Sequence, residues 1–594
     1  MNRVRVLLLS STRPSRPWRL ARKIMREVPG AEICGVVQRP LSELPLEQRI
    51  LALGSHEAPG LALDLGSRVR FWVRRTFAAI VHSVLWFVHG CPPELNRSSA
   101  FTPDSLEEKC AECGWPFLLA NDLESQSVSH FVACLAPDVV VAMGEVPSLP
   151  KTELEPSRGW IRARSNDVLG SAKAAKGLHL RIEHLSSHNV VAQELVGVTV
   201  PRQLYDSPVG FALKSDLVTD DLLVRAVAGI QSGTLAQTAA ALSHWIQNLL
   251  SPYIAQLGPS RPTAVLPSRR WFRPVWSLTV ETILLCSPVI VGRNWLRRLR
   301  RRYPALILVH HLVSDRAHRM SISTEAFWRQ VLFLRRHYRI VSLSDASEML
   351  QSGNVQIPAV ALTFDDGYAD NFISLRAVAE EFGITVTMFV TTVPVDLHRE
   401  FQHDLRRGQH GAFPITWQQI QYWKERGGEF GSHTRTHIKC GIVDRALLHD
   451  EIVGSKSDFE AHLGETPRFF AFPYGTPEDM SSEAMQIAGL AYPHFVSAFG
   501  GENFPDPEDG NTHLFRKNAY PEPWELELEL QSVFDLVKTA KRRLRLNESP
   551  APKPGSRSTP SPDLPALQPG LNFEQGANLL AEPSQVAQRL IKPS

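Results

Sequence analysis

The chain has 594 residues, of which 43% are hydrophobic and 21% are charged. These proportions are typical of globular proteins and exclude a collagen-like, wholly disordered or disulfide-scaffold chain. The 64 lysines and arginines against 61 aspartates and glutamates give a net charge of +3, so the overall charge gives no reason to expect nucleic acid as a partner. Seven cysteines, few and odd in number, favour reduced thiols.

The first part of the chain alternates short apolar runs with helical patterns. We predict strands at residues 4–9, 31–37 and 138–143, and helices at residues 18–28 and 127–135. This β-α-β alternation predicts a parallel sheet. The first apolar run is too short for a secretory signal, which favours a cytoplasmic protein.

Two longer apolar stretches, at residues 77–88 and 276–291, raise the question of a membrane. Neither reaches the roughly 20 apolar residues that a transmembrane helix needs. Arginines flank both stretches, which leaves two interpretations open. Each is either a core helix with a solvated basic end or a peripheral membrane contact through a basic segment.

Proline-rich stretches divide the chain. Residues 256–275 hold four prolines and four arginines, and residues 549–570 hold seven prolines. Such segments do not build a core. We therefore predict the following division: a domain at 1–250, a Pro/Arg-rich linker and basic helix at 251–303, a second domain at 304–546 and a disordered Pro-rich tail at 547–594.

The second domain repeats the alternation of strands and helices, so it too is predicted to be of the α/β class. The predicted strands lie at 306–309, 339–342, 360–364 and 385–390, and the predicted helices at 324–337, 371–382 and 524–546.

The strand at 360–364 ends in two adjacent carboxylates, Asp365 and Asp366, followed by a glycine. The carboxyl edge of a parallel sheet is where active sites gather. Two neighbouring carboxylates repel each other, and a metal ion would relieve this by binding one and leaving the other free as a base. Alone, Asp-Asp-Gly is also a common turn.

About 65 residues later the chain has His433 and His437. A spacing of four places both imidazoles on one face if the segment is one helical turn. Two imidazoles and one carboxylate suit a divalent transition metal with open coordination positions, as a hydrolase that activates water needs. Residues 470–475 are predicted to be a strand that ends in a tight Pro-Tyr-Gly turn.

Together these segments resemble the polysaccharide deacetylase family, also called the NodB-homology domain or carbohydrate esterase family 4. Residues 363–368 match its first motif, 432–437 its second and 472–475 its third, and the resemblance covers about residues 304–520. The resemblance implies a distorted (β/α) barrel and hydrolysis of acetyl groups on sugars or glycan intermediates.

The resemblance also implies roles for individual residues. It implies that a divalent metal, zinc or alternatively cobalt or nickel, binds Asp366, His433 and His437, and that Asp365 takes a proton from the metal-bound water. The backbone N–H of Tyr474 would stabilise the oxyanion. The implied substrate-binding residues are Pro473, Tyr474, Trp417 and Tyr368.

The chain departs from the family at two positions. Ala471 stands where many members have an arginine, and no late histidine clearly matches the family's general acid. Arg516 resembles the substitute found in a subset of members and is the catalytic candidate there, while His513 is the nearest imidazole. Without a proton donor, activity would be slow or lost.

Residues 5–10, 114–117, 137–144 and 204–210 give the first domain a looser resemblance to the formyltransferase fold, a Rossmann-like parallel sheet. Arg162 and Arg164 stand where that family has asparagine and histidine, so we predict a non-catalytic domain. The two arginines either bind an anion such as a phosphate or are plain surface charges.

The leading hypothesis is therefore a metal-dependent deacetylase acting on an acetylated sugar or glycan intermediate inside the cell. The alternatives are a two-domain binding or scaffold protein that has lost activity, and a bifunctional formyltransferase-deacetylase. The oligomeric state is open.

Overall fold

The computed structural model describes residues 3–44, 46–53, 88, 103–144, 156–168, 177–185, 192–203, 206–256, 283–316, 318–441, 444–506 and 510–534. All of them lie within one compact unit that runs from Met1 to Lys538. The tail predicted at 547–594, nearly all of the linker at 256–275 and nearly all of the apolar stretch at 77–88 lie outside the described residues. Among the helices that the structure describes, none has both the length and the apolar character needed to cross a bilayer.

A first sheet has seven strands in the order β3-β2-β1-β4-β5-β6-β7. The five strands from β3 to β5 are parallel, and β6 and β7 continue the sheet in antiparallel fashion. Because β4 is buried along its whole length and β1 at all but one residue, their apolar runs are unbroken. The strands are β1 Val4–Ser10, β2 Ala31–Gln38, β3 Phe117–Leu119, β4 Val139–Met143, β5 Trp160–Val168, β6 Gly177–Leu185 and β7 Gln193–Pro201. The three strands predicted here are confirmed.

Helices accompany this sheet, and the two predicted ones are confirmed as α1 and α5. The helices are α1 Ser15–Glu27, α2 Leu46–Leu53, α4 Pro103–Glu112, α5 Gln126–Leu135, α6 Pro208–Ser232, α7 Leu235–Trp245 and α8 Ser251–Gln256, with a π-helical turn, η3 Ile246–Leu250, between α7 and α8. Thr234 begins α7 with a capping box, in which its hydroxyl accepts the N–H of Gln237 and the Gln237 side chain accepts the N–H of Thr234.

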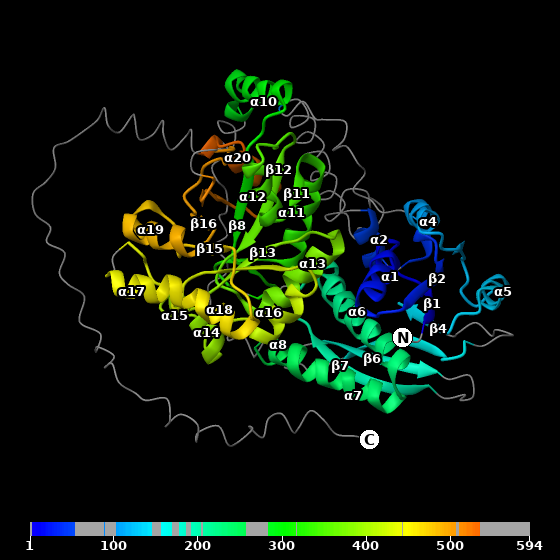
Figure 1. Ribbon diagram of the computed structural model, residues 1–594. Helices are drawn as coiled ribbons and strands as arrows, with labels where there is room; N and C mark the ends of the chain where they lie inside the picture. The colour runs from blue at the N-terminus through cyan, green and yellow to red at the C-terminus, as the bar shows by residue number, and fades with distance from the viewer. Residues whose placement is uncertain are drawn as a thin grey trace, which may run out of the picture. The chain divides into compact units, whose positions relative to one another are not determined.

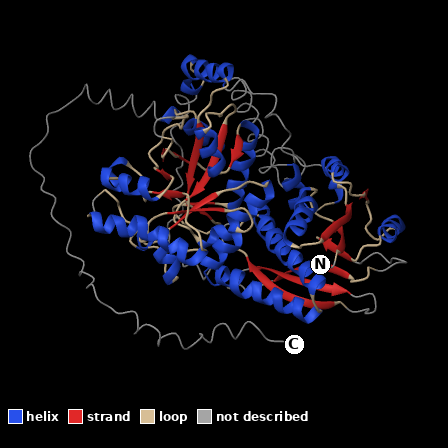
Figure 2. Cartoon of the chain, viewed as in Figure 1, coloured by secondary structure: helices blue, strands red, loops and turns tan. Residues whose placement is uncertain are grey.

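A second sheet has nine parallel strands in the order β17-β16-β15-β14-β13-β12-β8-β18, with β11 also paired to β12. Helices surround these strands (Figures 1 and 2). The strands are β8 Ala305–His310, β11 Arg339–Val341, β12 Ala359–Phe364, β13 Thr387–Val390, β14 Glu429–Ser432, β15 Phe469–Ala471, β16 His494–Val496, β17 His513–Leu514 and β18 Lys517–Asn518, and a separate pair is formed by β9 Leu312–Val313 and β10 Ser321–Ile322.

The ends of the second sheet lie close together. β17 is the last strand at one end of the order and β18 the last at the other, yet only Phe515 and Arg516 separate them in the chain. The three Cα–Cα steps from Leu514 to Lys517 span at most about 11 Å, so the sheet must curl until its edges come close together. The fold is thus an α/β structure with a curled parallel sheet, as the sequence predicts.

Helices of the second part follow the predicted order, with two differences. The helix at 324–337 is confirmed, but residues 369–372 form a separate 3₁₀ turn before α13, and α20 ends at Leu530. The part of the predicted helix beyond residue 534 lies outside the described residues. Ser532 has a positive φ of 60°, which α-helix cannot accommodate. The helices are α11 Thr324–His337, α12 Leu343–Gln351, η4 Ala369–Phe372, α13 Ser374–Phe382, α14 Thr392–Leu397, α15 Gln402–Leu405, α16 Trp417–Lys424, α17 Arg445–His449, η5 Asp450–Gly454, α18 Ser455–Leu463, η6 Pro477–Asp479, α19 Ser482–Ala491 and α20 Pro523–Leu530, preceded by α10 Pro288–Arg300.

Helix α6 contacts elements of both parts of the compact unit, namely α1 and α2 on one side and α11 and α13 on the other (Figure 1). Its carboxylates Asp216, Asp220 and Asp221 are buried and form ion pairs with α1 on one side and with α13 on the other. We call this group, with its partners, the α6 charge cluster: Arg13, Arg16, Lys23, Asp216, Asp220, Asp221, Arg376, Glu380 and Glu381. Burying a charge is costly unless it is paired, so these pairs require α1, α6 and α13 to pack together.

Candidate functional site

The candidate residues gather at one edge of the curled sheet. Asp365 and Asp366 follow the end of β12, His433 follows the end of β14, and Tyr474 lies three residues beyond β15. Because these strands are parallel, their carboxyl ends lie at the same edge. The structure therefore brings together segments that are more than 100 residues apart, at the edge where α/β enzymes place their chemistry.

Asp366 is surrounded by three imidazoles. Its Oδ1 lies 3.0 Å from His437 Nε2 and 3.7 Å from His433 Nε2, and its Oδ2 lies 3.7 Å from His403 Nε2. Burial alone would raise the pKa of Asp366, but positive charge on His437 and His403 outweighs burial and holds that pKa well below its usual range.

The two histidines of the second motif do not lie on a helix, so that sequence-based expectation is wrong. They lie in a loop after β14, in which Thr434 and His437 have positive φ values of 64° and 63°. The loop is fixed instead by Glu451, whose carboxylate accepts the N–H groups of Arg435 and Thr436 at 2.9 and 2.8 Å. These bonds replace the helical ones, and both imidazoles still face Asp366.

His433 is held in a defined orientation. Its Nδ1 donates to the carbonyl oxygen of Ala471, 2.8 Å away, which leaves Nε2 as the nitrogen that faces Asp366. Burial lowers the pKa of His433 to about 4, so the ring is neutral near pH 7. A neutral imidazole with a fixed tautomer is the form that binds a metal.

His403 is the functional candidate that the sequence did not reveal. It comes from the short helix α15, and its ring lies 4.2 Å from that of His437 between centroids. Ligand atoms of Asp366, His403 and His437 lie within 4.8 Å of one another. No partner at a recognisable spacing surrounds His403 in the sequence, so no signal could have identified it.

Asp365 is paired with Arg516. The guanidinium donates Nη1 to Oδ1 at 2.6 Å and Nη2 to Oδ2 at 2.8 Å, and Nε donates to the carbonyl oxygen of Ser497. Burial would raise the pKa of Asp365, but the charge of Arg516, with that of His433, outweighs it and lowers the pKa. Arg516 is fully buried, and both of its Nη groups and its Nε are engaged. Its two Nη groups hold both oxygens of Asp365, and the catalytic role expected of Arg516 stays a prediction.

Tyr474 and Tyr368, two further candidates, both lie close to the imidazoles around Asp366. Tyr474 has a φ of 60° and its ring packs edge-on against His437, with Pro473 before it in the same turn. Tyr368 is only 1% exposed, and its contact with substrate stays a prediction. Its hydroxyl donates to Asp404 at 2.7 Å and lies 3.2 Å from His403 Nε2, which makes it a support for His403.

Trp417 and His513 lie in other surroundings. Trp417 stacks on His462 with ring centroids 4.4 Å apart, and its indole N–H donates to Asp396 at 2.6 Å. It thus packs between α18 and α14. His513 Nε2 lies 2.9 Å from Ser497 Oγ, and its ring packs on Phe495.

His311 follows β8 and is partly exposed. The carbonyl oxygen of the preceding residue, His310, accepts the N–H of Asp365 at 2.9 Å, so His311 follows directly on a residue that is bonded to the paired carboxylates' segment. Its neighbour His310 is buried, its Nε2 lies 2.7 Å from Gln330 Oε1, and burial lowers its pKa to about 4. His311 is therefore the accessible imidazole of the pair.

The arginines of the first domain are also accounted for in part. Arg162 is buried and donates from Nε to Glu183 Oε2 at 2.7 Å, whereas Arg164 is exposed, with its Nε 3.7 Å from the same oxygen. A neighbouring strand therefore already neutralises Arg162. This pairing favours a structural role for Arg162 over anion binding.

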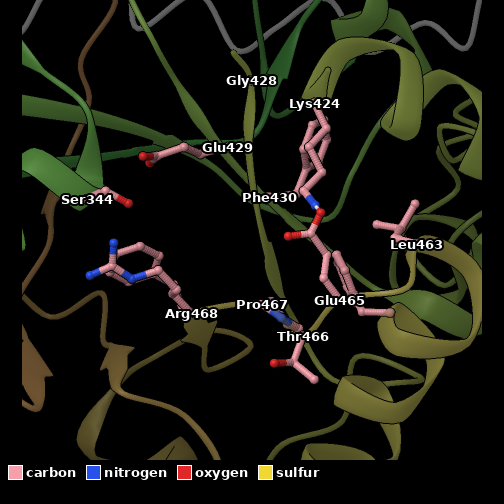
Figure 3. Close-up of a pocket in the computed structure, with 12 residues that line it drawn as sticks. Ser344, Lys424, Gly428, Glu429, Phe430, Leu463, Glu465, Thr466, Pro467 and Arg468 are labelled. Atoms are coloured by element: carbon pink, nitrogen blue, oxygen red, sulfur yellow. Dashed lines mark ion pairs between the residues drawn. The ribbon is translucent and has the colours of Figure 1, made fainter. Parts of the chain in front are cut away.

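A cavity of about 160 Å³ lies elsewhere in the second part (Figure 3). Its lining includes Glu429 at the start of β14 and Arg468 just before β15, and it holds the ion pair of Lys424 and Glu465. These residues lie at the amino ends of the strands, opposite the edge that carries Asp365. The cavity is therefore separate from the candidate site.

Paired carboxylates and convergent imidazoles at the carboxyl edge of a curled parallel sheet define an enzyme of the α/β class. A family model described as polysaccharide deacetylase matches residues 352–493, a range that includes Asp365, Asp366 and all three imidazoles around Asp366. The C-terminal region thus contains a polysaccharide deacetylase domain, which is a type of hydrolase that acts on carbon–nitrogen bonds. The sheet β1–β7 lies outside the matched range, and its formyltransferase-like character stays a prediction.

Two curated proteins are similar to part of the chain. A gellan lyase from a Bacillus species is 27% identical over 188 residues, which are 30% of this chain and 6% of the lyase. The putative polysaccharide deacetylase YxkH of Bacillus subtilis (strain 168) is 23% identical over 185 residues, which are 31% of this chain and 61% of that protein. The chain thus spans less than two thirds of the length of either relative.

Solved structures also resemble part of the chain. The Streptococcus pyogenes deacetylase PplD in complex with acetate is 21% identical, with a TM-score of 0.32, and the match covers 38% of this chain and 96% of that one. IcaB from Ammonifex degensii is 20% identical, with a TM-score of 0.33 and coverage of 39% and 97%.

Proposed function

We propose that the chain is a metal-dependent hydrolase that removes acetyl groups from acetylated amino sugars or glycan intermediates. The observation that supports this most directly is the division of labour between two adjacent carboxylates. Asp366 faces three imidazoles, while Asp365 faces a guanidinium. One carboxylate is therefore suited to bind a cation and the other to act as a base.

The residues around Asp366 fit a divalent metal. His437 Nδ1 is buried and has no hydrogen-bond partner among the described residues, and Asp366 Oδ1 faces the Nε2 atoms of His437 and His433 at 3.0 and 3.7 Å. Oxygen and imidazole nitrogen at convergent positions suit zinc, and cobalt or nickel can replace it. We assign Asp366, His433 and His437 as the ligands, with His403 beside them.

Asp365 is the proposed general base. Its low pKa keeps it charged near neutral pH, and the fork of Arg516 fixes both oxygens so that the carboxylate accepts the proton of an attacking water in one orientation. A bound metal would supply positive charge that polarises the acetyl carbonyl and acidifies water.

Two further groups complete the proposed reaction. The ring of Tyr474, in the turn after β15, packs against that of His437, and we propose that the backbone N–H of Tyr474 donates to the developing oxyanion. The leaving amine needs a proton, and His311 is a partly exposed imidazole that directly follows His310, whose carbonyl oxygen accepts the N–H of Asp365. We assign the proton donor to His311 rather than to Arg516, whose nitrogens are engaged and which does not lose its proton in proteins.

The proposed substrate class rests on the match of residues 352–493 to the polysaccharide deacetylase family model and on the similarity to a putative polysaccharide deacetylase. We propose an N-acetylated sugar oligomer or a nucleotide- or lipid-linked intermediate of one. For the first part of the chain we propose a non-catalytic supporting role, because Arg162 is paired with Glu183.

The test is acetate release from N-acetylated amino-sugar oligomers by the full chain, with zinc, cobalt or nickel added. We expect wild type to release acetate, Asp365→Asn to lose about 10²–10⁴-fold in rate, and Leu490→Glu, an exposed site on α19, to match wild type. If neither wild type nor the control releases acetate with any of the three metals, the proposal is wrong.

A further inference from the structure

Helix α10 is built as a regular helix with strong ends. Ser287 begins it by accepting the N–H of Ile290, Pro288 occupies the first helical position, and Arg301 ends it with a φ of 48°. Proline at that position and a left-handed residue at the end are strong helix boundaries. The helix therefore has a fixed set of faces.

One face of α10 is anchored to the protein. Ile290 and Asn294 are buried, and the Asn294 amide donates to Gln531 Oε1 at 3.0 Å. Arg297 forms an ion pair with Glu502, and Arg293 donates to Gln531. The anchored face thus combines the buried side chain of Ile290 with polar contacts, and it leaves other apolar side chains of the helix uncovered.

The opposite face exposes apolar side chains. Val289 is 72% exposed, Trp295 53%, Leu296 45% and Leu299 83%. With 3.6 residues per turn, positions 289, 292, 296 and 299 fall on one stripe, and Gly292 leaves it smooth. We call the four exposed side chains of Val289, Trp295, Leu296 and Leu299 the α10 apolar stripe. A contiguous exposed stripe of this kind on a helix marks an interaction surface.

Positive charge surrounds the stripe. Arg298, Arg300, Arg301 and Arg302 lie at its end, and residues 283–303 contain no aspartate or glutamate. Among the residues that the structure describes, the ion pairs of α10 involve Arg293 and Arg297, both with Glu502. The four terminal arginines therefore have no acidic partner in that part of the chain.

We propose that α10 docks on an anionic lipid bilayer and lies in the plane of its surface. The α10 apolar stripe would enter the boundary between headgroups and acyl chains, where tryptophan and leucine are favoured, while the terminal arginines bind lipid phosphates. A second copy of the chain is a poorer occupant, because it would bring the same four arginines face to face. Docking would hold the enzyme at a surface where lipid-linked substrates occur.

The experiment is co-sedimentation of the full chain with vesicles of phosphatidylcholine alone or mixed with phosphatidylglycerol. We expect binding to the mixed vesicles only, and weaker binding when salt is raised from about 0.1 M to about 1 M, since the screening length falls from about 10 Å to about 3 Å. Leu299→Glu should lower the partition coefficient at least tenfold, because a charge replaces a leucine side chain that the membrane would bury.

The matched control is Leu490→Glu, which replaces an equally exposed leucine, 84% against 83%, on α19. This variant should bind like wild type. Equal binding of wild type and Leu299→Glu, or no binding of wild type to either vesicle, overturns the proposal. A dimer of wild type in sedimentation velocity that dissociates in Leu299→Glu also overturns it, in favour of a second copy.

Discussion

Replacing Arg516 with methionine would leave the carboxylate of Asp365 buried without its countercharge. Both side chains are almost fully buried, at 0% and 6% exposure, and removing one partner of such a pair costs about 3–5 kcal/mol. An unfolding entropy of about 2.1 cal/mol/K per residue gives about 1.1 kcal/mol/K for a unit of the size of Met1–Lys538. We therefore expect Tm to fall by about 3–4 °C in calorimetry.

The same substitution should change the pH dependence of acetate release. Arg516 lowers the pKa of Asp365 against the effect of burial, so its loss raises that pKa and moves the acid limb of the rate profile to higher pH. Arg516→Lys keeps the charge but not the two-pronged geometry, and it should shift the limb less.

The matched control is Arg376→Met, which breaks an equally buried pair with Asp221 in the α6 charge cluster. It should lower Tm by a similar amount and leave the acid limb unchanged. If Arg516→Met loses stability but keeps the acid limb of wild type, Asp365 is not the base and the proposed mechanism is wrong.

Three further predictions concern other groups. His403→Ala should weaken zinc binding at least tenfold in competition with a chromophoric chelator, because its Nε2 lies 3.7 Å from Asp366; unchanged affinity would remove His403 from the site. His310, whose pKa is lowered to about 4 by burial, takes up its proton more readily when unfolded, so stability should fall as pH falls from about 6.5 to about 4. In urea titrations, the unfolding free energy of wild type should fall between pH 7 and about 4.5 by about 2–3 kcal/mol more than that of His310→Gln. An equal fall in both proteins would contradict this. Asp221→Asn should lower the free energy of unfolding by about 3 kcal/mol or more, since it leaves Lys23 and Arg376 partly unpaired. A decrease below about 1 kcal/mol would show that water reaches the α6 charge cluster.

Much of the fold could be predicted because it depends on local pattern. Buried parallel strands are continuous apolar runs, so β1, β4, β8 and β12 could be predicted within one or two residues. Asp365 and Asp366 could be placed at the sheet edge for the same reason, as they directly follow an apolar strand. The helix predicted for His433 and His437 failed because Glu451, which lies later in the chain, supplies the bonds that fix a loop.

The pairing of Arg516 with Asp365 and the presence of His403 at the site could not be predicted, because both depend on contacts between distant segments. Arg516 is one of the two residues between β17 and β18, and these two strands are the opposite ends of the strand order. It reaches Asp365 because the curled sheet brings its two ends together. The sequence shows that Ala471 replaces a family arginine, but it does not show that a guanidinium from between β17 and β18 pairs with the base. His403 approaches Asp366 from α15, a four-residue helix whose sequence has no periodicity to identify it.

The carboxylates of α6 show the same limit at the level of whole domains. Aspartates are mostly exposed in globular proteins, yet Asp216, Asp220 and Asp221 are all buried against α1 and α13. Lys214 on the same helix binds Asp315 in the segment after β9, at 2.9 Å. A predicted boundary near residue 250 separates these partners, although charge pairing requires them to fold in contact. Since Asp315 lies only four residues beyond His311, the first part of the chain supports the segment that holds the proposed proton donor.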